Sequence, residues 1–302
     1  MARTSLATDR QLTARMFVTG LLLVLLYAVV VGVLLAVGLS AAIVVPIALG
    51  VMFCQYWFSD RIALWGMAGQ VVTAEQAPEL HAAIDRLCAL ANMDKPLVAI
   101  ANTDVPNAFA TGRSPKTAVV CVTTGLLRRL DEPELEAVLA HELSHVAHRD
   151  VAIMTIASTL GMLAGLVTRF AFYADLFGGN NENSNGALVE LAVLVFSALV
   201  YAISFLLTRA LSRYRELAAD RSGALLTGQP SVLAAALVKI TGVMGQIPTK
   251  DLRSSQAFNA FFFTPAINGK QEVSLASLFS THPSLERRLA QLADLERQLH
   301  GA

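Results

Sequence analysis

Five consecutive residues, His141-Glu142-Leu143-Ser144-His145, carry the strongest chemical signal in the sequence. On a helix, side chains four residues apart project from the same face, so the two imidazoles can bind a single metal ion. Glu142 is turned by about 100° from His141, which places its carboxylate beside such an ion rather than on it. There Glu142 can take a proton from an attacking water and pass it to a leaving amine. The pattern predicts a hydrolytic zinc site with Glu142 as a catalytic residue.

The distribution of histidines favours this interpretation over a chance match. Short patterns of this kind do arise by chance. The chain has only 6 histidines, however, and three of them fall between His141 and His148. The helix that carries them also has a clear start, because Asp131 is a good N-cap, Pro133 is tolerated in the first turn and Glu134 completes a capping-box pattern.

A catalytic zinc site needs three protein ligands and an open fourth position. His148 lies on the same helical face as His141 but about 10.5 Å along the axis, which is awkward for one tetrahedral ion. We interpret it as a polar residue near a membrane boundary. The metzincin class is excluded, because it requires glycine at position 148 and histidine at position 151, where this chain has His148 and Val151.

A better third ligand comes from a helix predicted at residues 212–220. Glu216 and Asp220 are four residues apart there and share a face. We predict that Glu216 binds the ion, while Asp220 accepts the N–H of a ligand histidine and holds its orientation. Without the two histidines, the same carboxylates would be interpreted as a solvated face paired with neighbouring arginines. One Zn²⁺ per chain is expected, although ligands of these types also accept other divalent metals.

The elements around these residues include apolar segments of membrane-spanning length. Hydrophobic residues make up 55% of the chain and charged residues 15%, against roughly 45–50% and about 25% in soluble domains. The excess is concentrated in four runs: Phe17–Leu39, Ala41–Phe58, Val151–Val167 and Ala187–Thr208. The first two favour an uncleaved helical hairpin over a signal peptide, because the apolar core is long and a second run follows at once. The second two form either a membrane hairpin or a buried or partly embedded one.

Positive charge flanks these runs on one side. Arginines occur in the N-terminal tail and directly after the fourth run, at positions Arg3, Arg10, Arg15, Arg209, Arg213, Arg215 and Arg221. The loop at 175–186 between the third and fourth runs has neither lysine nor arginine. By the positive-inside rule, both termini and the large segment between the second and third runs are cytoplasmic.

Charge and cysteine content exclude two further classes. The 23 basic and 23 acidic residues balance, so there is no overall basic field to attract nucleic acid. Cys54, Cys88 and Cys121 are too few and too scattered for a disulfide framework. We interpret them as packing residues in a reducing compartment.

Four stretches in this order resemble the HtpX family of bacterial membrane zinc proteases, relatives of the CAAX prenyl endopeptidase. They are Asp104–Arg113 (DVPNAFATGR), the helix of His141 with the following His148-Arg149-Asp150, Arg215–Asp220 (RELAAD) and Ser280–Ser284 (STHPS). The resemblance runs from about Phe58 to Leu289 and is specific, because an apolar hairpin separates the two metal-binding motifs. It implies a gluzincin-type fold, chemistry that faces the cytoplasm and proteolytic quality control of membrane proteins.

The same resemblance implies a substrate-binding role for Asn107, on an edge strand that pairs with an extended substrate. The residues give partial support, because 97–101 and 118–123 are predicted as short strands around the Asn107 loop. A simple turn role after Pro106 stays open.

Near the C-terminus, the resemblance implies that His282 is catalytic and faces the oxyanion, and that Arg288 belongs to the same motif and to the substrate-binding residues. A donor to the oxyanion is otherwise missing from the predicted site. A capping or structural role for His282 competes, because Pro283 follows it and opens a last predicted helix.

We therefore predict a mostly α-helical protein with a small β-sheet: an integral membrane zinc metalloprotease with two transmembrane hairpins and a cytoplasmic gluzincin-like catalytic domain. The predicted parts are a tail at 1–16, membrane hairpins at 17–58 and 151–208, and a catalytic domain in two parts at 59–150 and 209–302. The expected substrates are polypeptides, above all misfolded or damaged membrane proteins of a bacterial cell membrane. An inactive membrane scaffold with structural zinc and a prenyl-protein endopeptidase are the alternatives. The sequence indicates neither the oligomeric state nor the role of the aromatic cluster at 258–263.

Overall fold

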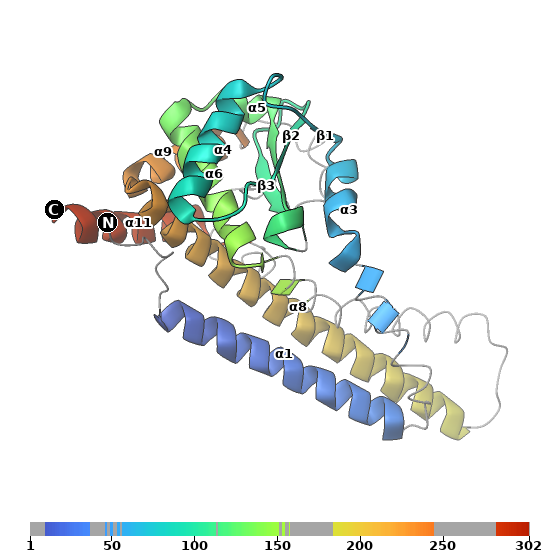
Figure 1. Ribbon diagram of the computed structural model, residues 1–302. Coiled ribbons are helices and arrows are strands. Elements are labelled where there is room, and N and C mark those ends of the chain that lie inside the picture. The colour runs from blue at the N-terminus through green and yellow to red at the C-terminus, as the bar shows by residue number, and fades with distance from the viewer. Residues whose placement is uncertain are drawn as a thin grey trace.

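The computed structural model of this chain describes residues 10–36, 46, 49–50, 53–54, 56–112, 114–150, 153–154, 157, 184–244 and 282–301. Two long helices, α1 (Arg10–Ala36) and α8 (Ser184–Thr227), lie side by side, and a second body of helices around a sheet packs against the C-terminal half of α8 (Figure 1). The predicted combination of many helices with a small β-sheet is confirmed.

This second body contains the remaining helices and strands. Its helices are α3 (Ser59–Gly66), α4 (Pro78–Ala91), η1 (Pro115–Thr117), α5 (Thr124–Leu127), α6 (Glu132–Ala147), α9 (Pro230–Met244) and α11 (Leu285–His300). Its strands are β1 (Gly69–Val71), β2 (Leu97–Ala101), β3 (Ala108–Thr111) and β4 (Val119–Thr123).

The sheet is mixed, with the strand order β1-β2-β4-β3. Strands β2 and β4 are parallel, with Leu97 opposite Val119 and Ala101 opposite Thr123. The outer strands β1 and β3 run antiparallel to their neighbours. The strands predicted at 97–101 and 118–123 are thus confirmed. Strand β3 lies at one edge of the sheet, on the side that packs against α6.

Helix α6 lies at the centre of this body, in contact with β3, α4, α8 and α9. Its start is the predicted capping box: Asp131 Oδ1 accepts the Glu134 amide at 3.1 Å, and Glu134 Oε2 accepts the Asp131 amide at 3.1 Å. Glu134 also pairs with Lys239 of α9. Leu139 and Leu143 are 0% and 1% exposed and belong to the main hydrophobic core. Packing therefore holds α6 along its whole length.

Helix α8 joins two predicted segments into one. The fourth apolar run and the helix predicted at 212–220 are continuous in its 44 residues, a length of roughly 66 Å at about 1.5 Å per residue. Within the described part of the chain, the segment Val195–Thr227 is the one helix whose length and mean hydropathy of 1.7 meet the requirement for crossing a membrane.

Helix α1 packs along α8 through a small hydrophobic cluster in which Leu23 meets Leu211 and Ala157. Ala157 also contacts α8 directly, because its carbonyl accepts a 3.1 Å hydrogen bond from Thr208 Oγ1. Helix α1 begins at Arg10, before the predicted start of the first apolar run at Phe17. Most of the second and third predicted runs, and the whole aromatic cluster at 258–263, lie outside the described residues.

Candidate metal centre

Three side chains from two helices converge on one point. His141 and His145 of α6 bring their Nε2 atoms to 3.1 Å from each other. Glu216 of α8 reaches them with one carboxylate oxygen each, at 3.7 Å from His141 Nε2 and 3.5 Å from His145 Nε2. All three side chains are largely buried. Among the described residues, this is the one group with the spacing of metal ligands.

These distances fit a tetrahedral zinc ion. With zinc–ligand bonds of about 2.0–2.1 Å, two ligand atoms of a tetrahedral site lie roughly 3.3 Å apart, close to the separations within this group. The donor set is two imidazoles and one carboxylate, which is one of the sets that catalytic zinc sites use, with the fourth position left for water or substrate. The residues present therefore fit the metal that the sequence predicts.

The close approach of the two helices depends on a glycine. Gly223 of α8 lies against the α6 backbone, where a Cβ atom would come within 2.7 Å of the His141 nitrogen and 2.9 Å of its Cα. Any larger residue would push the helices apart, because backbone atoms cannot move aside as a flexible side chain can. Gly223 follows Glu216 by about two turns, so the contact sets the distance between the ligand helices.

Asp220 supports the first histidine. Its Oδ1 lies 2.9 Å from His141 Nδ1, so the carboxylate can accept that N–H and leave the Nε2 lone pair for a ligand. Arg288 of α11 donates two hydrogen bonds to the same carboxylate, from Nε to Oδ2 at 2.7 Å and from Nη2 to Oδ1 at 2.6 Å. Arg288 is 1% exposed. It thus lies behind Asp220 as seen from His141, and its predicted part in substrate binding stays a prediction.

Asp150 supports the second histidine. This residue follows α6, and its Oδ2 lies 2.5 Å from His145 Nδ1. The other carboxylate oxygen pairs with the buried guanidinium of Arg215, the residue before Glu216. Both imidazoles are thus backed by a carboxylate, and each carboxylate is backed by an arginine.

Burial and hydrogen bonding shift the pKa of the two imidazoles in opposite directions. Burial alone would lower the pKa of His141, but its hydrogen bonds to Asp220 and Glu216 outweigh this effect and raise it to about 9. For His145, burial dominates and lowers the pKa to about 4. The two imidazoles thus differ in the balance between burial and the neighbouring carboxylates.

Glu142, the predicted general base, directly follows His141 on α6. It is 4% exposed, and burial raises its pKa above the ordinary value, while the nearby imidazoles and a hydrogen bond from the Ala110 amide oppose the shift. A raised pKa suits a carboxylate that must both accept and return a proton. The contact with Ala110 also shows that Glu142 faces edge strand β3.

His282 lies beside the third ligand. Its Nδ1 is 3.1 Å from Glu216 Oε2, and the side chain is 4% exposed. The last helix, α11, begins at Leu285 with Ser284 as its N-cap, two residues later than the predicted opening at Pro283. The oxyanion role of His282 stays a prediction.

Asn107 directly precedes the edge strand β3. Its backbone carbonyl accepts a hydrogen bond from the Thr123 backbone N–H at 2.9 Å, and its backbone N–H donates to Thr123 Oγ1 at 2.9 Å. The residue is 0% exposed. It therefore anchors the start of β3 to β4, and the predicted contact with substrate stays a prediction.

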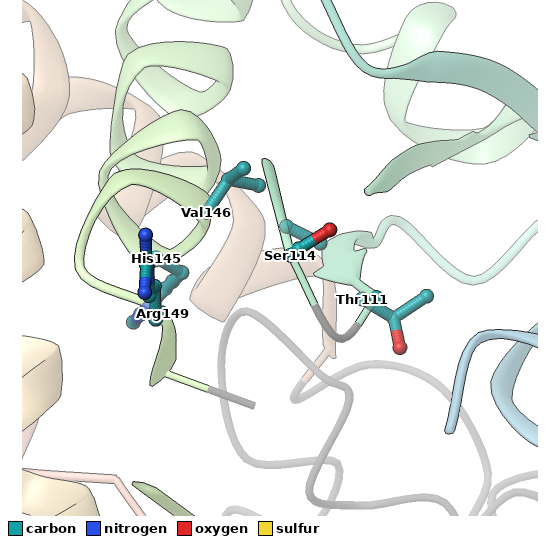
Figure 2. Close-up of a pocket in the computed structure, with 7 residues that line it drawn as sticks. Thr111, Ser114, His145, Val146 and Arg149 are labelled. Carbon is teal, nitrogen blue, oxygen red and sulfur yellow. The ribbon is translucent and has the colours of Figure 1, made fainter. Parts of the chain in front are cut away.

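A small pocket lies between the end of α6 and β3. Its lining consists of Ala110, Thr111, Gly112, Ser114, His145, Val146 and Arg149. Figure 2 shows His145, Val146 and Arg149 on the helix side and Ser114 and Thr111 on the strand side. The pocket thus opens beside one of the candidate ligands.

The sequence predicted no part in the metal centre for three residues that lie in it: Asp150, Arg215 and Gly223. Asp150 and Arg215 belong to stretches that were recognised as motifs, and their charge beside metal ligands is the signal that could have drawn attention to them. Gly223 offers a weaker signal, a glycine inside an otherwise regular helix.

Comparison with known proteins identifies the family. The family model described as "Peptidase family M48" matches residues 74–296. The chain is 60% identical to "Protease HtpX homolog 1" of Streptomyces coelicolor over 98% of this chain and 96% of the relative. It is 53% identical to "Protease HtpX homolog" of Moorella thermoacetica over 98% of each chain.

Two further proteins are similar over most of the chain. "Protease HtpX homolog 2" of Methanosarcina mazei is 47% identical over 96% of this chain and 97% of the relative. A solved structure, the crystal structure of S. mikatae Ste24p, has a TM-score of 0.47 and 18% identity over 89% of this chain and 67% of that chain. By its match to the family model and its identity to these relatives, the chain belongs to peptidase family M48 and is a metalloprotease of the HtpX type.

Proposed function

We propose that this protein is a zinc-dependent endopeptidase of the cytoplasmic membrane that cleaves membrane proteins or segments extracted from them. The observation that carries the proposal is the convergence of His141, His145 and Glu216, with Nε2 and carboxylate oxygens 3.1–3.7 Å apart, next to the buried Glu142.

The residues of the site divide the chemistry among them. Bound zinc would polarise the scissile carbonyl and acidify a water molecule. Glu142 takes the proton of the attacking water and returns it to the leaving amine, for which its raised pKa is suited. His282 is the proposed hydrogen-bond donor to the oxyanion of the tetrahedral intermediate. Asp220 holds the His141 imidazole so that its Nε2 lone pair is available as a ligand.

An extended peptide can bind along β3. The strand lies at the edge of the sheet, and peptides are commonly bound by addition to such an edge, where backbone hydrogen bonds give affinity without strong sequence preference. The Ala110 amide links this edge to Glu142, and the pocket beside His145 lies next to it. A substrate strand at this edge would bring its peptide bonds close to the candidate ligands.

The path of α8 supports a site close to the bilayer. Glu216 lies on the same unbroken helix as the apolar segment that begins at Val195. It follows the end of the predicted fourth run at Thr208 by about 12 Å along the helix axis. We propose that α1 and the first part of α8 are embedded in a bacterial cell membrane, with the two-part catalytic domain and both termini in the cytoplasm.

The test of the metal site compares two variants of full-length, detergent-purified protein. Glu142→Gln should retain one zinc per chain and lose peptide cleavage by at least about a hundredfold, as expected for loss of a general base. Glu216→Ala should lose zinc. Glu136→Gln, on the same helix but in an exposed ion pair with Arg86, is the control and should behave as wild type.

Three results would contradict the proposal. Cleavage that survives Glu142→Gln would remove Glu142 from the mechanism. Zinc retained by Glu216→Ala would remove the third ligand. Wild-type protein that holds zinc but cuts no polypeptide would instead support a structural metal.

The substrate class needs a separate assay. Wild type and Glu142→Gln are each incubated with a model membrane protein and with a soluble unfolded protein, with and without a chelator. We expect cleavage of the membrane protein that depends on metal and on Glu142. Cleavage of the soluble substrate alone under matched conditions would refute the proposed preference.

A further inference from the structure

We propose that Asp150 and Arg215 form a positioning pair for His145: Asp150 holds the imidazole in the orientation and tautomer that a metal ligand needs, and Arg215 holds Asp150 in place. The inference rests on the proposed zinc site and deepens it. Neither residue touches the reacting atoms, so both act through His145.

The first support is the contact between carboxylate and imidazole. Asp150 Oδ2 lies 2.5 Å from His145 Nδ1, and Asp150 is 7% exposed. A carboxylate at Nδ1 keeps the proton on that nitrogen and directs the Nε2 lone pair away from it. In this structure the Nε2 atom points to Glu216 and His141, at 3.5 Å and 3.1 Å. The contact thus sets both the tautomer and the direction of the candidate ligand.

The second support is the partner of the carboxylate. Arg215 is 3% exposed and pairs with the other oxygen of Asp150. A buried carboxylate beside an imidazole needs a compensating positive charge, and a buried guanidinium needs a partner of its own. The ion pair therefore brings two buried opposite charges together, and the carboxylate has His145 on one side and Arg215 on the other. Since Arg215 directly precedes Glu216, the pair also ties the end of α6 to the ligand turn of α8.

The third support is the backbone that brings Asp150 back to His145. Helix α6 ends with His148 as its C-cap, and Arg149 has a φ of 55°. Non-glycine residues are uncommon in this left-handed region. The reversal lets Asp150, which follows the helix, reach an imidazole one turn inside it. Helices commonly end with a left-handed residue at this position, and here the turn places Asp150 in contact with His145 and Arg215.

The arrangement repeats the support of the other histidine. Asp220 and Arg288 hold His141 through the same order of groups, imidazole, carboxylate and guanidinium. The two systems come from different parts of the chain, since Arg288 lies on α11 and Arg215 on α8. Asp150 and Arg215 also lie directly before and directly after residues 151–214, the segment that contains the predicted second hairpin. Their ion pair therefore joins the two ends of this segment.

The experiment measures metal binding as well as activity. Zinc release from purified full-length protein into a chromogenic chelator is timed, and the visible absorption of the cobalt-substituted protein reports the ligand geometry. Asp150→Ala should speed zinc release by about 10–100-fold, the usual effect of removing a group that orients a metal ligand, and should change the cobalt spectrum. Asp294→Asn and Arg297→Met, in an exposed Asp–Arg pair on α11, are the matched controls and should match wild type.

Two double variants separate positioning from general packing. Asp150→Asn/Arg215→Met and Asp150→Ala/Arg215→Met both lack the ion pair, but only the first keeps an acceptor for the His145 N–H. We expect the asparagine variant to release zinc at least about tenfold more slowly than the alanine variant, in line with the cost of losing such an acceptor. Equal release rates for the two, or wild-type rates for all variants, would overturn the proposal.

Arg215→Lys decides the question if the other variants do not fold. Lysine keeps the charge but loses the planar fork of the guanidinium. Faster zinc release with an unchanged unfolding temperature of the metal-free protein supports positioning, whereas wild-type release rates overturn it. Failure of the proposed function looks different, because wild-type protein itself would then bind no zinc.

Discussion

At the scale of single residues, the metal centre is built on buried charge. Asp220 is 0% exposed, Arg288 is 1% exposed, and the pair is joined by two hydrogen bonds of 2.7 Å and 2.6 Å. Such a pair contributes little net stability compared with apolar packing, but removal of one member leaves an uncompensated charge in the interior. The centre therefore makes the protein sensitive to any change that removes one partner alone.

Arg288→Met is expected to destabilise the metal-free protein strongly. Loss of the guanidinium leaves the Asp220 carboxylate buried beside His141, at a cost of about 3–5 kcal/mol in the free energy of unfolding. For a domain of this size, the unfolding temperature should fall by roughly 6–20 °C, which differential scanning fluorimetry measures. Arg297→Met, on the exposed face of the same helix, should shift it by no more than about 2 °C. Equal melting temperatures for wild type and Arg288→Met would show that the pair is not needed.

Two buried thiols report on the integrity of the core. Burial raises the pKa of Cys88 to about 11 and the pKa of Cys121 to about 12. Because the thiolate is the reactive form, both thiols should resist a maleimide reagent at pH 7 in the folded protein. Both should react once the denaturant guanidinium chloride has unfolded the protein. Mass spectrometry of peptides from the two states measures the labelling. Rapid labelling of either thiol in the folded protein would contradict the burial of Cys88 on α4 and Cys121 on β4, which are 5% and 0% exposed.

At the scale of elements, the centre depends on the crossing of α6 and α8. Helix α8 is continuous from the apolar segment to the turn that carries Glu216. Helix α6 is fixed by its capping box and by the core around Leu139 and Leu143. Gly223 permits the two backbones to touch beside His141, so the distance between the ligands from the two helices is set at this contact.

Gly223→Ala should weaken zinc binding through this contact. The added methyl group would meet the α6 backbone at 2.7–2.9 Å, and the helices can relieve the overlap only by separating. Since overpacking typically costs about 1–3 kcal/mol, we expect lower stability and a zinc affinity reduced by about tenfold or more, measured by competition with a chelator. Gly242→Ala on α9 is the control, because nothing lies within 4 Å of the added group and alanine favours a helix by up to about 1 kcal/mol. Loss of zinc affinity in both variants would show that helix contact is not the cause.

At the scale of the whole molecule, the proposal concerns the position of the catalytic body relative to the bilayer. Helices α1 and α8 extend away from the sheet and lie together (Figure 1). Many large apolar side chains of α1 and α8 are exposed, among them Phe17, Leu25, Leu191 and Leu199. An exposed apolar surface of this kind needs a partner, and a bilayer provides one.

Reporter fusions test this arrangement. A reporter that is active only in the cytoplasm should be active when fused to the C-terminus and inactive when inserted at Asn180, between the third and fourth apolar runs. A reporter that is active only outside the cytoplasm should give the opposite result. The positive-inside distribution of arginines is the physical reason for this orientation. Cytoplasmic activity at both sites would refute a second hairpin that crosses the membrane.

Local features of the sequence were sufficient for much of this description. The capping box at Asp131, the strands β2 and β4 and the helical character of α6 and α8 follow from periodicity and from side chains that act on their own backbone. The pairing of His141 with His145 follows from the geometry of one helix. These features could be predicted because each depends on residues that are close together along the chain.

Contacts between distant residues required the folded molecule. Arg288 belongs to a recognised motif, yet its place behind Asp220 depends on where α11 packs. Asp150 and Arg215 meet because a left-handed turn at Arg149 brings the end of α6 against α8. No local pattern encodes such a meeting, since burial and helix crossing arise only when the whole core assembles. The sequence alone thus indicated the metal chemistry, its ligands and the part of Asp220, whereas the positions of Asp150, Arg215 and Arg288 behind the ligands became known only from tertiary packing.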